Sequence, residues 1–277
     1  MTTMTMPDVG LEPYVLGTQD EEIARLALQH QVWRPHALDA WRRADFGAGQ
    51  TILDVGCGPG YAALDLSEIV GPMGCVVAMD ACARFLDVLE AQCCQRGIQN
   101  IVTLQLDLDE ACQPAQADGA WCRWVFSFLQ RPRVLLERIA EVLKPGAVLV
   151  LHEYFDYATW RVTPRSPQLE QFARLVVEDW RDTGGDPDIG LRLAEWLPEL
   201  GFSTASIRPI IDVVPPSSYL WEWQRSFMHA ALRRLVNAGR MTRQQSGVVL
   251  QSFCAVEAAT DALMVTPAVL EVIAVKR

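Results

Sequence analysis

The first half of the chain alternates short apolar runs with longer amphipathic ones. The apolar runs predict buried strands at 51–53, 75–79, 101–106, 120–126 and 147–151. The amphipathic runs predict helices at 61–70, 81–97 and 132–143, because their apolar residues recur at the spacing of one helix face. Strands that alternate with helices in this way favour an α/β fold with a parallel, doubly wound sheet.

The two ends of the chain depart from this alternation. Before the first strand, the pattern predicts helices at 20–32 and 35–44. After the fifth strand it predicts helices at 166–183, 190–200, 218–237 and 242–260, a sixth strand at 203–214, and a last strand at 263–275 that Pro267 splits. We therefore expect a single domain over 1–277. Its core would be 47–214 and 262–277, with a helical cap at 1–46 and a helical insertion at 215–261 that forms a lid.

The turn after the first strand carries the pattern D-x-G-x-G-x-G, which consists of Asp54, Gly56, Gly58 and Gly60. Glycines let a ligand approach the backbone, and the helix that follows offers N–H groups to it. A dinucleotide-binding turn would need glycine where the chain has Tyr61, and the G-K-[S/T] triplet of a phosphate-binding loop is missing. The turn thus indicates a site for a different polar ligand.

Acidic residues follow the next two strands. Asp80 ends the second strand, at a distance from the glycine turn where nucleoside-binding α/β folds place a carboxylate that accepts from ribose hydroxyls. A plain helix cap is the alternative role for Asp80. Asp107 and Leu108 follow the third strand, and an ordinary surface aspartate is the alternative reading there.

The glycine turn, Asp80, Asp107 and the stretch R-P-R-V-L-L-E-R-I-A-E-V-L-K-P-G at 131–146 resemble class I S-adenosylmethionine-dependent methyltransferases. The resemblance covers most of the chain and points to the small-molecule subgroup that includes quinone and natural-product enzymes. It implies a Rossmann-like, doubly wound sheet of seven strands with the last one antiparallel. It also implies methyl transfer from S-adenosyl-L-methionine to N, O or C of a small organic acceptor, with S-adenosyl-L-homocysteine as product.

The resemblance also implies a set of cofactor contacts. The glycine turn would lie against the methionine moiety, Asp54 would meet its amino group, Asp80 the ribose, and Asp107 with the Leu108 N–H the adenine. Arg123, inside an apolar strand, is either near the cofactor carboxylate or part of a structural ion pair, since a buried guanidinium needs a partner. The residues expected to bind the cofactor are Tyr14, Asp54, Gly56, Gly58, Gly60, Asp80, Asp107, Leu108 and Arg123.

The acceptor side depends on residues after the fifth strand and on aromatic residues of the outer helices. His152 and Glu153 are the catalytic candidates, because strand ends line the site of open α/β sheets and histidine has a suitable pKa for a general base. A structural hydrogen-bonding role is the alternative for both. The candidates for acceptor binding are Trp33, Tyr154, Trp221 and Phe227, although aromatic residues at helical spacing also serve simply as packing.

Composition narrows the partners. The net charge of −10 disfavours nucleic acid, and the four histidines show no metal-ligand spacing with acids. Scattered cysteines, no signal peptide and no apolar run of membrane-spanning length indicate a cytoplasmic protein, with a homodimer as one option. The alternatives are the same fold acting on RNA or protein, a nicotinamide-dependent oxidoreductase, and a non-catalytic cofactor-binding relative.

Overall fold

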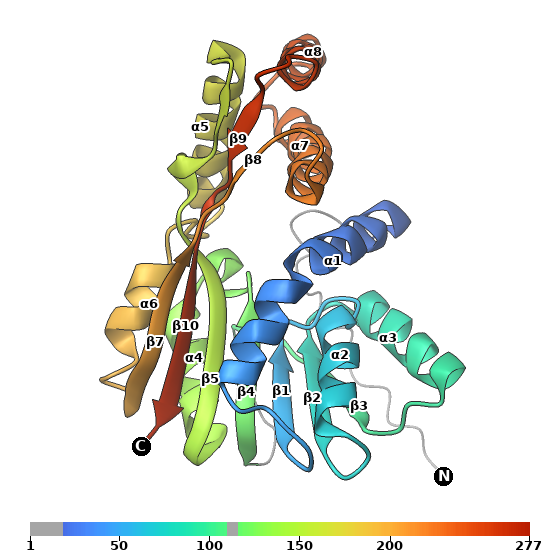
Figure 1. The fold of residues 1–277 in the computed structure, drawn as a ribbon, viewed down its shortest axis with the longest axis vertical. Helices are drawn as coiled ribbons and strands as arrows, with labels where there is room; N and C mark the ends of the chain where they lie inside the picture. Colours follow the sequence, from blue (N-terminus) through green and yellow to red (C-terminus); the bar gives the residue numbers. More distant parts are fainter. Residues whose placement is uncertain (1–18, 110–115) are drawn as a thin grey trace.

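The computed structural model describes residues 19–109 and 116–277, so the predicted cofactor contact Tyr14 lies outside the described residues. Its centre is a seven-stranded sheet in the order β3-β2-β1-β4-β5-β10-β7 (Figure 1). The strands are β1 Thr51–Val55, β2 Cys75–Asp80, β3 Ile101–Gln105, β4 Ala117–Arg123, β5 Leu143–Asp156, β7 Phe202–Ile210 and β10 Ala268–Lys276. Strand β10 runs antiparallel to both neighbours, and the strands from β3 to β5 pair in parallel. The predicted doubly wound sheet with an antiparallel last strand is confirmed.

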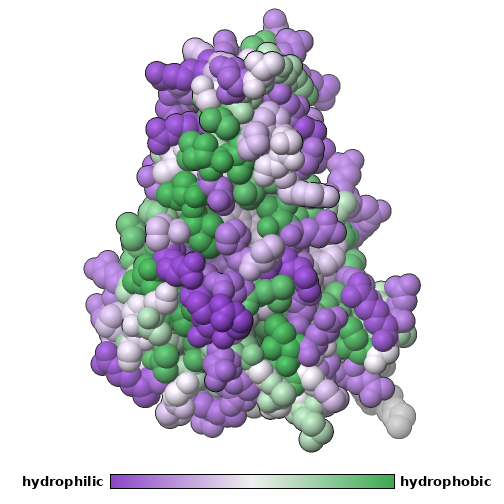
Figure 2. Space-filling model, in the orientation of Figure 1, coloured by the Kyte–Doolittle hydropathy of each residue, from purple (hydrophilic) through white to green (hydrophobic). Residues whose placement is uncertain are grey.

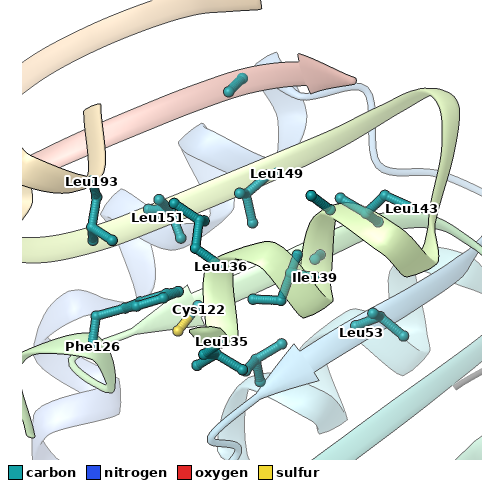
Figure 3. Close-up of a cluster of buried hydrophobic side chains, with 14 of the residues drawn as sticks. Leu53, Cys122, Phe126, Leu135, Leu136, Ile139, Leu143, Leu149, Leu151 and Leu193 are labelled. Carbon is teal, nitrogen blue, oxygen red and sulfur yellow. The ribbon is translucent and has the colours of Figure 1, made fainter. Parts of the chain in front are cut away.

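Helices cover both faces of this sheet. On one face, α2 (Tyr61–Val70), α3 (Ala83–Arg96) and the second half of α1 (Asp20–Arg43) bury apolar residues in one cluster with residues of β1, β2, β4, β5 and β10. On the other face, α4 (Pro132–Val142) and α6 (Gly190–Trp196) form a core whose leucines and Phe126 are seen in Figure 3. This burial of apolar surface on both faces supplies the main stabilisation of the sheet.

A second group of elements lies beyond the carboxyl ends of the central strands, at the top of Figure 1. It contains α5 (Pro167–Asp182), α7 (Tyr219–Asn237), α8 (Arg243–Glu257) and a small antiparallel sheet of β6 (Arg161–Thr163), β9 (Leu263–Val265) and β8 (Val213–Val214). Two short 3-10 helices, η1 (Phe126–Phe128) and η2 (Tyr157–Thr159), follow β4 and β5. We call this group the upper lobe; it has its own aromatic-rich core.

The upper lobe departs from the expected lid. Helix α5, which the sequence pattern assigned to the core range 47–214, packs against α7 and α8 instead. The last strand is split at Pro267 into β9 and β10, as predicted, but the expected sixth strand is also interrupted, because β7 stops at Ile210. The separate pieces β8 and β9 pair with each other, and β9 with β6, in the small sheet. The sequence of an amphipathic helix indicates which face is apolar, but not which element packs against that face. Strands of two or three residues are too short for an alternating pattern to be recognised.

Helix α1 is one helix, whereas the pattern predicted two separated at Pro35. Proline removes one backbone hydrogen bond of a helix. Buried tryptophans hold α1 on both sides of that position: Trp33 packs edge-on against Trp124, and Trp41 packs edge-on against Trp121 of β4. The helix therefore continues through the proline, and its first half extends from the sheet towards the upper lobe (Figure 1).

The surface carries mostly mixed polar and apolar residues. Figure 2 shows hydrophobic residues gathered on the upper part of one face, in the region of β8 and β9, where Val213 and Leu263 are exposed. None of the helices in residues 19–109 and 116–277 has the length and apolar character that crossing a bilayer requires.

Candidate functional site

A cavity of about 890 Å³ lies where the carboxyl ends of β1, β2 and β4 face the first half of α1 and the upper lobe. Ligands of open α/β sheets bind at this edge. Nine of the predicted site residues line the cavity: Asp54, Gly56, Gly58, Asp80, Asp107, Leu108, Arg123, Tyr154 and Phe227. Gly60, His152, Glu153, Trp33 and Trp221 are not among the lining residues.

The three glycines of the turn have different reasons to be glycine, although all have positive φ. A Cβ on Gly56 would clash with the side chain of Val125, and one on Gly60 would clash with that of Leu89. Among residues 19–109 and 116–277, a Cβ on Gly58 would meet only Leu26, at 4.0 Å. Close packing therefore requires the first and third glycines, whereas Gly58 leaves backbone open to the cavity.

Asp80 holds this turn in place. One carboxylate oxygen accepts from the Gly58 N–H at 2.8 Å, and the other accepts from the Cys82 N–H at 2.9 Å. Burial raises the pKa of Asp80, and the backbone N–H groups oppose that change. Residue 82, not Asp80, is the cap of α3, so the alternative role as helix cap does not apply. Each oxygen keeps a second lone pair for a ligand in the cavity.

Asp54 and Arg123 bring opposite charges to the floor of the cavity. Burial raises the pKa of Asp54 to about 7, and the nearby Arg123 opposes this. Burial also lowers the pKa of Arg123 to about 10. Among the described residues, Asp54 Oδ2 and Arg123 Nη1 are buried and have no hydrogen-bond partner. Buried polar atoms are normally paired, so the two atoms suit a ligand that carries both a cation and an anion.

Asp107 and Asp109, which follow β3, stabilise a loop at the edge of the cavity. Asp107 Oδ1 accepts from the Asp109 N–H at 2.9 Å, and Asp109 in turn accepts from the Arg131 N–H at 2.8 Å. Leu108, between them, is buried and lines the cavity. The loop after β3 is thereby tied to the start of α4.

His152 lies away from the cavity, because β5 continues past residue 151 to Asp156 and keeps it inside the sheet. Its ring is fully buried against Trp121, and Nε2 lies 3.2 Å from Glu271 Oε2 of β10. Burial lowers the pKa of His152 to about 4. The role of general base does not fit this position.

Glu153 also serves the framework. Its Oε1 accepts from the N–H groups of Val125 and Phe126, at 2.7 and 2.9 Å, and so caps the start of η1. Burial raises the pKa of Glu153 to about 7. The structural alternative stated for His152 and Glu153 describes both residues better than the catalytic one.

Of the four aromatic residues predicted to bind the acceptor, two line the cavity and two are buried outside it. Tyr154 and Phe227 line the cavity together with Phe128 and Trp180, and Tyr154 stacks on Trp124 with 5.4 Å between ring centres. Trp33 and Trp221 are fully buried outside it. Trp33 packs between Trp124 and Trp223, and Trp221 packs on Phe253, so packing describes these two better than acceptor binding does.

The roof of the cavity belongs to the helical cap predicted at 1–46, although Arg25, Leu26 and His30 were not among the predicted site residues. Arg25, Leu26, Gln29 and His30 of α1 line it, and Gln29 Oε1 accepts from both Arg25 and the indole of Trp223 in α7. The structure marks the site in one further way, since Trp124 at the cavity has φ of 53°. A bulky residue in that region indicates local strain, but the sequence carries no sign of it.

Part of the chain matches a known protein family. Residues 52–146, which contain the glycine turn, Asp80 and Asp107, match the family model described as "Methyltransferase domain". Over this stretch, about a third of the chain, the sequence is similar to methyltransferases. A demethylmenaquinone methyltransferase of Lactococcus lactis is 32% identical over 45% of this chain and 49% of its own length. An aklanonic acid methyltransferase of a Streptomyces species is 26% identical over 48% of this chain and 63% of its own length. The alignments thus span about half to two thirds of these relatives.

Solved structures share the overall fold of the chain. A putative methyltransferase of Bacillus halodurans superposes with a TM-score of 0.58 at 16% identity, over 86% of this chain and 97% of its own. The [4+2]-cyclase SpnF superposes with a TM-score of 0.54 at 19% identity, over 88% of this chain and 80% of its own. At such identities the likeness concerns the fold alone.

Proposed function

We propose that the chain is an S-adenosylmethionine-dependent methyltransferase that acts on a small organic molecule. The proposal rests on the presence of polar groups of opposite charge in one cavity. Asp54 and Arg123, each with a buried atom that has no partner in the described part of the chain, line the same cavity as Gly58. The methyltransferase domain that matches residues 52–146 supports the same reading.

The lining residues fit the parts of the cofactor. Asp54 would receive the ammonium of the methionyl group and Arg123 its carboxylate, because each offers the complementary charge at a desolvated position. Asp80 would receive the ribose hydroxyls, and Asp107 with Leu108 the adenine. When bound, S-adenosylmethionine supplies a methyl group on a positively charged sulfur, which becomes the neutral thioether S-adenosylhomocysteine.

The acceptor would lie at the aromatic end of the cavity. Phe128, Tyr154, Trp180 and Phe227 line that end, and stacked rings there suit a flat, apolar molecule. Relatives named for demethylmenaquinone and aklanonic acid support an aromatic acceptor. The walls would hold the acceptor atom in line with the methyl group and exclude water, and such positioning accounts for a large part of the rate gain in group transfer.

Isothermal titration calorimetry with S-adenosylmethionine, S-adenosylhomocysteine and NADH tests the first half of this proposal. We expect micromolar or tighter binding of the two sulfur nucleosides, and no binding of NADH. Mass spectrometry of reactions with hydroxylated naphthoquinones, phenols, amines, an RNA pool and a protein extract tests the second half. Binding of NADH alone would overturn the assignment, and labelling of RNA or protein without any small molecule would overturn the acceptor class.

A further inference from the structure

A buried chain of polar side chains links Arg123 to the outer surface of the domain. Arg123 Nη2 lies 3.2 Å from His30 Nδ1, and His30 Nε2 lies 3.0 Å from Asp65 Oδ2. Asp65 also accepts from Arg34 Nε at 2.7 Å. The chain joins three elements: β4, the first half of α1, and α2.

The chemistry of these groups fixes where the protons are. A guanidinium only donates hydrogen bonds, so His30 Nδ1 must accept from Arg123. The proton of a neutral imidazole then lies on Nε2, where it is donated to the Asp65 carboxylate. Burial and the nearby Arg123 both lower the pKa of His30, against the effect of Asp65. The neutral form with a proton on Nε2 is therefore the one that satisfies all the contacts.

The guanidinium of Arg123 is held on its faces as well as on its edge. Its Cζ lies 5.6 Å from the ring centre of Trp121 and 5.3 Å from that of Trp124, distances at which an aromatic face attracts a cation. His30 holds Nη2, and Nη1 is the terminal nitrogen without a partner among the described residues. The contacts leave Nη1, with its two N–H groups, for whatever occupies the cavity.

We infer that His30, backed by Asp65, is a positioning residue that aims the Arg123 guanidinium at the α-carboxylate of the bound sulfur nucleoside. This rests on the proposed function. His30 belongs to α1, the helix that roofs the cavity. Binding of the carboxylate by Arg123 therefore depends on α1 being packed over the cavity. A roof that is displaced leaves Arg123 without its acceptor and the carboxylate without an oriented donor.

A pair of ligands isolates this role. S-Adenosylhomocysteine carries the α-carboxylate, whereas 5′-methylthioadenosine has the same nucleoside and thioether but no amino-acid group. Calorimetry on the wild type should give tighter binding of S-adenosylhomocysteine. In His30→Ala we expect its affinity to fall by about tenfold, the usual weight of one charge-assisted hydrogen bond, with 5′-methylthioadenosine nearly unaffected.

Two further variants separate positioning from damage. His30→Gln keeps an acceptor for Arg123 and a donor for Asp65, so it should regain most of the lost affinity. Arg123→Met keeps the length of the side chain without its charge. Once Arg123 is replaced, His30→Ala should add no further loss of S-adenosylhomocysteine affinity, because a residue that acts through Arg123 has nothing left to position.

Each other outcome has a definite meaning. Equal loss of both ligands in His30→Ala, with no recovery in His30→Gln, would show that His30 only shapes the cavity and would overturn the inference alone. Additive losses in the double variant would do the same. Failure of the folded wild type to bind S-adenosylhomocysteine would overturn the proposed function along with it. If Arg123→Met does not fold, the comparison of His30→Ala with His30→Gln still decides.

Discussion

The imidazole of His152 lies 3.2 Å from the carboxylate of Glu271, on the face of the sheet that α1 covers and outside the cavity. A second partner, Arg43 of α1, forms an ion pair with the same carboxylate. The residue that the sequence offered as a general base is thus part of a buried joint between β5, β10 and α1.

The first prediction concerns that joint. His152→Ala should lower the free energy of unfolding by about 2–4 kcal/mol, because it opens a cavity and removes a partner of buried Glu271. Cofactor affinity and turnover of the folded variant should remain close to wild type. Since burial holds the pKa of His152 at about 4, the pH profile of turnover between pH 6 and 9 should not change. Exposed His229→Ala in α7 is the control; a folded His152→Ala without turnover would restore the catalytic role.

The second prediction concerns the open glycine. Gly58→Arg should abolish binding of S-adenosylhomocysteine in calorimetry, because its side chain enters the cavity. Gly97→Arg is the matched control: Gly97 has a similar φ of 68°, a Cβ added to it would meet nothing within 4 Å, and it does not line the cavity. Both variants carry the same backbone strain, of about 1 kcal/mol, so their melting temperatures should fall together. Retained binding in Gly58→Arg would contradict the cofactor site.

The third prediction concerns pH and Glu153. Its pKa in the folded chain, about 7, lies above its ordinary value of 4.5, so between these values the folded chain holds a proton that the unfolded chain has lost. This contribution to stability is fully present below the ordinary pKa and is lost as the pH rises through about 7. Glu153→Gln can still accept from the N–H groups of η1 but cannot ionise. Relative to wild type, it should gain on the order of 2–3 kcal/mol between pH 5 and pH 8 in urea titrations; a difference that does not vary with pH would refute it.

The fourth prediction concerns the aromatic wall. Phe227→Ala should raise KM for the acceptor by about tenfold through lost apolar contact, with cofactor affinity unchanged. Tyr219→Ala on the same helix is the control, because Tyr219 is 72% exposed and lies outside the cavity lining. Equal KM values for the two variants would remove Phe227 from the acceptor site.

The sequence was sufficient to predict the site residues that lie close together along the chain, within one strand–turn–helix–strand segment. Asp54, Gly58 and Asp80 belong to a strand, a turn and a strand end within one short stretch, so local spacing brings them together. The parallel, doubly wound arrangement of the sheet followed from the same alternation of strands and helices. These features depend on neighbours in the chain, and periodicity reads them directly.

The sequence failed where position depends on distant partners. The pairing with β10 lengthens β5 to Asp156, which carries His152 and Glu153 into the sheet. His30 reaches the cavity only because α1 folds back over the strand ends. Trp33 and Phe227 are both aromatic residues within amphipathic helices. Trp33 nevertheless lies in the core, whereas Phe227 lines the cavity. Helical periodicity specifies an apolar face without naming what covers it.

Pro35 separates two parts of α1 that contact different parts of the protein. Residues before it, including His30, contact the cavity, whereas residues after it, such as Trp41, pack on the sheet. Proline is favoured at the first position of a helix, so a helix that began at Pro35 would still cover the sheet while lacking the entire roof. The boundary between the residues that pack on the sheet and those that roof the cavity thus falls inside one helix, and protein engineering can vary the roof residues upstream of Pro35 while leaving the sheet-packing residues of α1 intact.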